Sequence, residues 1–404
     1  MAEPLAPSWL VTIGEYLQEE SEKQWFWFSV FIVTLLVGAF WLEASLTLPG
    51  VEESPMLGEG ETIEQVQWND DGTESLILVD RADNSPLRFS TSTGLSVVDS
   101  GNAIPRYIST TDSGWLVSGD DGYLASFNGN TFNNITLNWD GEVAPDIISV
   151  ASNDGDSGFI ITKRSSLTQL HTFADGEVSD GTPAPVDSTV MTSVHLSKRG
   201  HLAVVIGYDT DLGNPSFGPA GEVIIRADAV LGEAPALYLL HHGAGGEIHS
   251  AYFVDEGNWG DDVEMVIAGG TSTLLLLSDS SIIDLPGVGG STAATIDENG
   301  IFWLARGDSL EILSISSDRA GVQIHKISSS VAVDATVGTS ADGEVQFYGT
   351  GVDGYVGVLS FDPADSDDVS QSLALFGDLL FVILVISCLV IIGHMFYVNE
   401  LKPW

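Results

Sequence analysis

The segment Asn69-Asp-Asp-Gly-Thr-Glu-Ser-Leu-Ile-Leu-Val79 shows the pattern that decides the fold of this 404-residue chain. A polar turn ends in glycine, and a short apolar segment with β-strand character follows it. Asn, Asp and Gly are residues of tight turns, and glycine readily adopts the positive φ that many hairpins require. The same arrangement recurs with turn glycines at Gly114, Gly155, Gly200, Gly257, Gly300 and Gly343. The sequence therefore predicts seven copies of one hairpin-containing unit.

The turn glycines are separated by 42, 41, 45, 57, 43 and 43 residues. The long interval contains an insertion of about fourteen residues, Asp209 to Glu222, which is rich in Gly, Pro and Asn. A repeat of about 43 residues has the length of a four-stranded propeller blade. Because no long helical period interrupts the repeats, we expect an all-β, seven-bladed β-propeller. A pair of β-sandwiches, a β-helix, and rings of six or eight blades stay open as alternatives.

A second likeness links two of the repeats. Asp121-Gly-Tyr-Leu-Ala-Ser-Phe127 in the second unit is similar to Asp353-Gly-Tyr-Val-Gly-Val-Leu-Ser-Phe361 in the seventh. On these repeats the chain resembles the broad class of seven-bladed propellers with WD-like or YVTN-like repeats, over about three quarters of its length. It departs from WD repeats proper, since no Gly-His and Trp-Asp pair recurs, and Thr93-Gly94 is an isolated echo of quinoprotein blades. The resemblance implies a ring closed by strands from both chain ends, with ligand sites on one face and in the central channel.

Two apolar runs flank the repeats. The first, Trp25 to Leu42, has no charged residue and would span about 27 Å as a helix, close to the thickness of a hydrocarbon core. The second lies between Leu379 and Val398. The acidic segment before the first run disfavours a cleaved signal peptide. We therefore expect one transmembrane α-helix at each end, and Gly38 and Gly393 allow the helices to approach closely.

Positive charges near the runs predict the orientation. Lys23 and Lys402 both lie on the tail sides of the runs. Positive residues favour the cytoplasmic side, so both termini are predicted to be cytoplasmic and the propeller extracytoplasmic, on a two-span protein of the cell membrane. The expected division is a tail at 1–24, helices at 25–44 and 378–398, an acidic linker at 45–61, the propeller at 62–368, a linker at 369–377 and a tail at 399–404.

The charge balance is strongly acidic. The chain has 13 Lys and Arg against 57 Asp and Glu, for a net charge of -44. Such a surface repels phosphate backbones, which excludes nucleic acid as a partner. Acidic, lysine-poor surfaces stay soluble in salty surroundings, and in this respect the chain resembles proteins of halophilic or marine archaea; a cation-binding surface is the alternative. Cys388 is the single cysteine, so no internal disulfide can form.

One histidine-rich segment is a candidate ligand-binding site. It contains His241, His242, Glu247 and His249 within a glycine-rich stretch. Neutral imidazoles beside a carboxylate suit zinc or a similar divalent ion. The repeat places this segment between the outer strand of the fourth blade and the inner strand of the fifth, on the same face as the insertion. The spacing matches no established metal motif, and ordinary loop and strand histidines are the alternative.

Two further candidates concern calcium and glycosylation. Asn153-Asp-Gly-Asp-Ser-Gly158 resembles a calcium loop but lacks the bidentate glutamate of an EF-hand, and turn chemistry explains its composition without an ion. Asn134 begins an Asn-Ile-Thr sequon that is usable on an exported domain. No cofactor is predicted, although calcium and zinc stay open. No nucleophile elbow, P-loop or dinucleotide fingerprint occurs, so no catalytic residue is assigned.

The expected function follows from the rigid repeat, the double anchor and the lack of a catalytic signature. We expect a membrane-tethered, extracytoplasmic protein-binding scaffold or accessory subunit of a membrane complex. The alternative is a propeller hydrolase or lyase with a metal-dependent site on the face of His241 and His249. A ligand sensor that signals through paired helices is a third class, for which the tails are short. Fold alone does not choose among these classes.

Overall fold

The structure is a computed structural model with two compact units, one of residues 50–363 and one of both chain ends. It describes residues 29–39, 48–364 and 377–390, apart from gaps at 49, 56, 58–60, 81–86, 140–142, 199–201, 213–220, 255–258, 260–261, 286–287, 307–310, 316–321, 328–333, 342, 351–355, 378 and 388.

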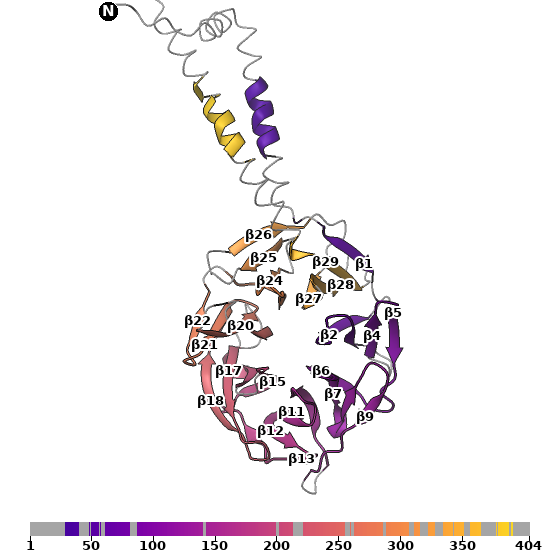
Figure 1. Cartoon of the computed structure of the whole chain (residues 1–404). Coiled ribbons are helices and arrows are strands. Elements are labelled where there is room, and N and C mark those ends of the chain that lie inside the picture. The colour runs from indigo at the N-terminus through magenta and orange to yellow at the C-terminus, as the bar shows by residue number, and fades with distance from the viewer. Residues whose placement is uncertain are drawn as a thin grey trace, which may run out of the picture. The chain divides into compact units, whose positions relative to one another are not determined.

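The unit of residues 50–363 is a ring of antiparallel sheets around a central axis (Figure 1). The described strands form seven sheets, which confirms the predicted all-β, seven-bladed propeller. From the axis outward, the strands of blades 1 to 3 are β2 (Thr62–Trp68), β3 (Ser75–Asp80), β4 (Leu87–Thr91) and β5 (Gly94–Val98); β6 (Pro105–Thr111), β7 (Gly114–Gly119), β8 (Leu124–Phe127) and β9 (Phe132–Asn134); and β10 (Asp146–Ala151), β11 (Ser157–Arg164), β12 (Leu167–Ala174) and β13 (Glu177–Val178), with β14 (Thr182–Pro183) also paired to β12.

Blades 4 to 7 follow the same order from the axis outward. Their strands are β15 (Thr189–Leu196), β16 (Ala203–Asp209), β17 (Gly221–Asp228) and β18 (Ala236–His242); β19 (Ile248–Phe253), β20 (Val263–Gly269), β21 (Thr273–Leu277) and β22 (Ile282–Asp284); β23 (Ala293–Ile296), β24 (Phe302–Ala305), β25 (Glu311–Ile315) and β26 (Val322–Lys326); and β27 (Asp334–Ala341), β28 (Glu344–Thr350), β29 (Val356–Phe361) and β1 (Glu52–Pro55). Two 3₁₀ turns, η1 (Asp120–Gly122) and η2 (Thr210–Leu212), follow β7 and β16.

The repeated polar turns all join the first and second strands of a blade. Gly72, Gly155, Gly300 and Gly343 have φ between 68° and 84°, which glycine adopts without steric cost. The repeat read from the sequence is therefore the hairpin between the inner strand and its neighbour. Since the inner strand starts at the opposite end of the blade, the described turns lie on one face of the ring, and the starts of the inner strands lie on the other.

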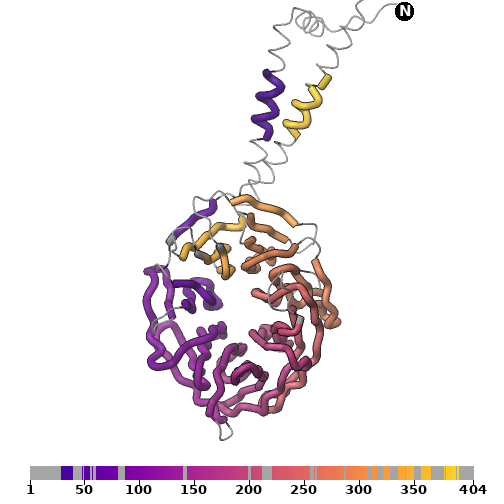
Figure 2. Tube along the Cα trace, turned by 180° about the vertical axis from the view of Figure 1, so that it is seen from behind, coloured from indigo at the N-terminus to yellow at the C-terminus, as the bar shows by residue number. Residues whose placement is uncertain are grey.

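The ring closes by pairing strands from its two ends. β1 is the outer strand of blade 7 and pairs antiparallel with β29, with Glu52 opposite Ser360 and Pro55 opposite Gly357. In Figure 2 these first and last strands lie side by side. Closure by both ends was expected, but residues 52–55 were assigned to the acidic linker 45–61. The sequence Glu-Glu-Ser-Pro lacks the apolar alternation of a strand, because an outermost strand contributes little to the core.

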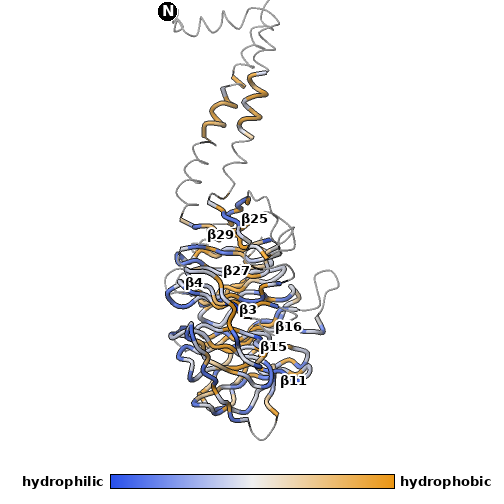
Figure 3. Tube along the Cα trace, turned by 90° about the vertical axis from the view of Figure 1, so that its right-hand side faces the viewer, coloured by the Kyte–Doolittle hydropathy of each residue, from blue (hydrophilic) through white to orange (hydrophobic). Residues whose placement is uncertain are grey.

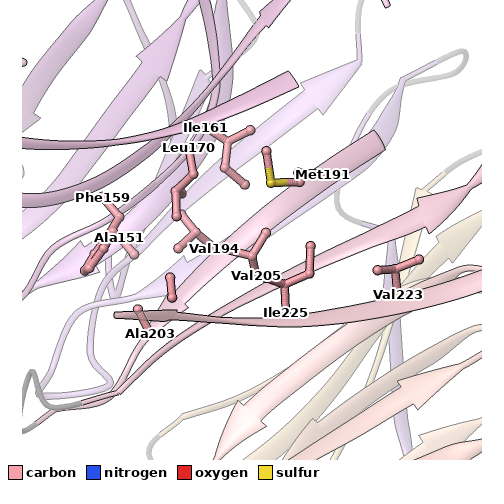
Figure 4. Packing of buried hydrophobic residues seen from close by; sticks show 11 residues of the cluster. Ala151, Phe159, Ile161, Leu170, Met191, Val194, Ala203, Val205, Val223 and Ile225 are labelled. Carbon is pink, nitrogen blue, oxygen red and sulfur yellow. The ribbon is translucent and has the colours of Figure 1, made fainter. Parts of the chain in front are cut away.

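Apolar side chains between neighbouring blades form the core. Between blades 3 and 4, Phe159, Leu170, Met191 and Val205 are buried in one cluster, which Figure 4 shows in close view. Figure 3 shows apolar residues along strands such as β3 and β15. Full burial of an apolar side chain of this size contributes about 1.5–3 kcal/mol to the stability of the folded state. Within the described residues, five further apolar clusters lie between other pairs of neighbouring blades.

The unit of the chain ends contains helical residues 29–39 and 379–387. Gly38 is buried against the ring of Phe381, where a Cβ atom would overlap the ring. This confirms that Gly38 permits close approach of the two segments, whereas Gly393 lies outside the described residues. Within the described ranges, neither helix has the length and apolar character needed to cross a membrane. Residues 25–28, 40–44, 378, 388 and 391–398 of the two predicted spans lie outside the described part.

Candidate functional site

The inner strands carry β-bulges that turn side chains toward the axis. In six of the seven blades the described pairing of the first two strands skips one residue near the start of the inner strand. A bulged residue has no partner across the ladder and is re-aimed away from it. The skipped residues all line one cavity of about 920 Å³, and we call them the bulge ring: Glu64, Arg106, Ile148, Thr192, His249 and Thr336.

Arg106 is held in place by a carboxylate from its own blade. Its Nε lies 2.7 Å from Oδ1 of Asp120 and its Nη2 lies 3.0 Å from Oδ2. This bidentate geometry is the strong form of an arginine–carboxylate contact. The hydrogen bonds to Asp120, together with the charges of Asp120, Asp146 and Glu64, raise the pKa of Arg106. Two of the donors on this guanidinium are therefore already in use.

Glu64 is the acidic member of the bulge ring. Its carboxylate makes no hydrogen bond or ion pair with the part of the chain that the structure describes. Partial burial inside the channel and the charge of Asp80 raise its pKa, and the charge of Arg106 opposes the shift. Glu64 is exposed to the solvent of the cavity, and a carboxylate that lacks a direct partner there favours a cation or a donor in its vicinity.

His249 supplies an uncharged imidazole to the same cavity. Its Nδ1 lies 2.9 Å from Oγ of Ser250, and its Nε2 lies 3.1 Å from Oγ of Ser291 on the next blade. Desolvation inside the ring lowers the pKa of His249 to about 4. His195, deeper along β15, bonds Oγ of Ser193 and also has its pKa lowered to about 4 by desolvation. Both imidazoles are therefore neutral at pH 7.

His241 and His242 have different partners, away from the bulge ring. His242 Nε2 lies 2.6 Å from Oδ2 of Asp209, and His241 Nε2 lies 3.2 Å from Oε1 of Glu222. The two carboxylates are almost inaccessible, with side chains 3% and 7% exposed. Asp209 ends β16 and Glu222 lies in β17, so the two pairs hold the base of the insertion between these strands.

Hydrogen bonds keep both carboxylates ionised. A bond from Ser188 leads the contacts that lower the pKa of Asp209, followed by the Asp211 amide and His242. At Glu222 burial opposes ionisation, but bonds from His241 and the Gly245 amide hold the pKa below its ordinary value. A Cβ atom at Gly243 or Gly245 would meet the Glu222 carboxylate. The glycine-rich composition of this loop therefore serves close packing around Glu222.

The predicted histidine site thus divides into two places. The segment does link β18 to β19, as predicted, on the face where β16 ends and β17 begins; residues 213–220 of the insertion lie outside the described part. His241 and His242 bond buried carboxylates, whereas Glu247 and His249 line the channel. Among the described residues, no group of three or more His, Cys, Asp or Glu side chains has the geometry of a metal site.

The structure also describes the surroundings of the calcium-loop candidate and of the glycosylation sequon. Asp154 Oδ1 accepts hydrogen bonds from the amides of Asp156 and Ser157, each at 2.9 Å, so its carboxylate organises the turn itself. Asn153 donates to the carbonyls of Ser197 and Lys198 on the next blade. Asn134 ends β9 and is exposed, which leaves the predicted glycosylation sterically open.

Sequence reasoning missed four residues of the site. Asp209 and Glu222 were recognised only as the limits of the insertion, and charged residues at both limits were a usable signal. Glu64 and Arg106 gave no signal, because a bulge depends on pairing register rather than on residue type.

Comparison with known proteins shows the fold. No protein-family model matches the chain, and no curated protein matches it. Among solved structures, a streptogramin B lyase is 12% identical with a TM-score of 0.54, over 76% of this chain and 96% of that chain. The β-propeller domain of Myceliophteria thermophila Cps50 (Swd1) is 11% identical with a TM-score of 0.52, over 77% and 100%. A chain of the mitotic checkpoint complex is 11% identical with a TM-score of 0.50, over 78% and 92%.

Proposed function

We propose that this chain is a membrane-tethered, extracytoplasmic propeller that binds a protein partner as a scaffold or accessory subunit. The observation that carries the proposal is the pairing of β1 with β29. It returns both ends of the ring to one blade, so the preceding and following segments start from the same place. A ring whose two chain ends meet in one blade suits a double membrane anchor, and a closed ring of blades offers a binding platform.

Exposed apolar residues on blade 4 support partner binding. Val230, Leu231, Tyr238 and Leu239 are 66%, 50%, 53% and 41% exposed. Tyr238 and Leu239 lie on β18, an outer strand whose free edge can accept a further strand. Successive side chains of a strand point to opposite faces, so Tyr238 and Leu239 offer an apolar contact on each side of β18. Solved neighbours that include a chain of the mitotic checkpoint complex are consistent with this use of the fold.

Affinity purification from gently solubilised membranes tests the scaffold function. We expect the full chain to retain a partner, and the double variant Tyr238→Ser, Leu239→Ser to lose it. Val97→Ser is the matched control, since Val97 is 60% exposed on the outer strand of blade 1. A chain that migrates alone under all solubilisation conditions would contradict the proposal.

Protease treatment of intact cells tests the tether and the orientation. We expect an external protease to remove the propeller while tags on both termini stay protected. Release of the whole chain by a carbonate wash would contradict the anchor, and digestion of both tags with a protected propeller would reverse the orientation.

A hydrolase or lyase is the second candidate. The observation that favours it is the neutral His249 imidazole in an accessible cavity, bonded to two serine hydroxyls. The fold likeness to a streptogramin B lyase is consistent with it. Metal analysis for zinc and calcium, with His249→Ala and His241→Ala assayed side by side, is the test. Absence of bound metal and of any effect of either variant would remove this candidate.

A further inference from the structure

We propose that the bulge ring is a receptor for one cationic side chain, lysine or arginine, presented by a protein partner. This inference rests on the proposed scaffold function and names the chemistry of the partner. Its basis is the geometry of the cavity and the hydrogen-bonding state of Glu64 and Arg106, which are the two charged members of the bulge ring.

The position of Glu64 is built by the fold. The pairing of β2 with β3 passes from Ile63 opposite Val79 to Gln65 opposite Leu78, so Glu64 is left out of the ladder and faces the cavity. Gln65 is fixed on its other side, because its side chain both donates to the Ile108 carbonyl and accepts from the Ile108 amide, at 2.7 and 2.9 Å. The backbone on which Glu64 stands is therefore anchored to two neighbouring strands.

The neighbouring guanidinium does not neutralise Glu64. Arg106 stands on the equivalent bulge of blade 2 and donates two hydrogen bonds to Asp120. The positive charge of Arg106 lowers the pKa of Glu64, but the negative charge of Asp80 raises it. The charges of Asp120, Asp146 and Glu64 act on Arg106, and Asp80 adds negative charge at Glu64, so a further cation would be attracted to this side of the cavity. Lys198 also lines the cavity, but it follows the end of β15, at the other end of the inner strands from the bulges.

The remaining members of the bulge ring can contact the methylene groups of a lysine or arginine side chain and accept its hydrogen bonds. Thr192, Thr336 and His249 are polar and uncharged, and Ile148 is apolar. Neutral groups do not repel a cation, and an apolar surface accommodates the methylene stem of lysine or arginine. With a volume of about 920 Å³, the cavity is much larger than one such side chain, so part of the presenting loop fits with it.

The test uses the full chain in mild detergent and a fluorescein-labelled peptide, Gly-Ser-Gly-Arg-Gly-Ser-Gly, with fluorescence anisotropy as the readout. A lysine peptide and a citrulline peptide of the same length are the companion probes, and citrulline is the neutral isostere of arginine. We expect the arginine or lysine peptide to bind and the citrulline peptide to bind at least about tenfold more weakly, because a charge-assisted hydrogen bond is lost.

Two substitutions with opposite expected effects on peptide affinity locate the binding site. Glu64→Gln should lower the affinity for the cationic peptide at least about tenfold. Arg106→Gln should raise it several-fold, because it removes the competing charge and releases Asp120. Glu298→Gln is the matched control, since it removes one charge from an exposed turn on the opposite face. Circular dichroism spectra that match those of the unchanged protein show that each variant has folded.

Three outcomes overturn the inference: no binding of either cationic peptide, equal binding of the citrulline peptide, or equal weakening by Glu64→Gln and Glu298→Gln. Competition with methylguanidinium distinguishes the source of the cation. Displacement only at concentrations far above that of the peptide supports a side chain in a protein loop, whereas equal potency would favour a small free cation and contradict a protein partner. Failure of partner co-purification with intact peptide binding would reject the scaffold function while leaving this site standing.

Discussion

At the scale of single residues, the loop between blades 4 and 5 depends on glycines that leave room for a buried carboxylate. A Cβ atom at Gly245 would lie 2.7 Å from Oγ1 of Thr271 and 2.9 Å from Oε1 of Glu222. We therefore expect Gly245→Ala to lower the free energy of unfolding by about 1–3 kcal/mol, because the crowded groups must move. Chemical denaturation measures the change.

Gly270→Ala is the control for this prediction. A Cβ atom at Gly270 meets nothing within 4 Å, and Gly270 does not have a positive φ. The free energy of unfolding should change by less than about 0.5 kcal/mol. Equal destabilisation by the two variants would show that backbone freedom, rather than the contact with Glu222, governs this loop.

The two channel histidines predict a pH dependence. Desolvation lowers the pKa of His195 and of His249 from 6.5 to about 4. As the pH falls from 6.5 toward 4, the unfolded chain binds protons at these positions and the native chain does not, so stability decreases across this window. His195→Gln should flatten the decrease, which thermal unfolding between these pH values measures. A native His195 resonance that titrates near 6.5 by NMR would contradict the prediction.

The buried carboxylates act in a separate, more acidic window. The pKa values of Asp209 and Glu222 are lowered from 3.8 and 4.5. Their contribution is complete above those values and is lost as the pH falls through the lower native pKa values. His242→Ala should therefore reduce stability at pH 7 and also weaken the acid dependence, because the bond to Asp209 is absent at all pH values.

At the scale of elements, β1 closes the ring. Without it, β29 becomes the free edge of blade 7 and Leu57, which is buried beside β29, is also lost. We expect a chain of residues 60–363 to melt about 5–10 °C below a chain of residues 50–363 and to associate through the open edge. Calorimetry and light scattering measure the two effects, and equal melting temperatures would show that β1 does not contribute to closure.

The inner hairpins could be predicted from the sequence, whereas the outer strand β1 could not. Each of the seven hairpin turns is a polar segment that ends in Gly, directly after Asp or Asn in four of them, and an apolar segment follows, so seven blades could be counted. Outer strands such as β1, β9 and β13 are short and contribute few buried residues, so they leave no period to detect. The bulges, which decide that Glu64 and His249 face the channel, arise from register between strands and are invisible in a single sequence.

At the scale of the whole molecule, the net charge of -44 opposes compaction. Only 13 basic residues are available to offset 57 acidic ones, so repulsion between negative charges outweighs the attraction between opposite charges. Salt screens this repulsion, with a Debye length of about 10 Å at 0.1 M and about 3 Å at 1 M. We therefore expect the melting temperature to rise as NaCl increases over this range.

Two comparisons separate screening of charge from a general effect of cosolutes. Sucrose of equal osmolality stabilises compact states by exclusion from the surface and leaves the charges unscreened, so the salt dependence should remain in its presence. Replacement of exposed acidic residues remote from the bulge ring, such as Glu298→Gln with Asp284→Asn, should lessen the salt dependence. A melting temperature that stays constant or falls with NaCl would show that the acidic surface is not under net repulsion, and would favour cations bound at specific acidic sites as the explanation of this composition.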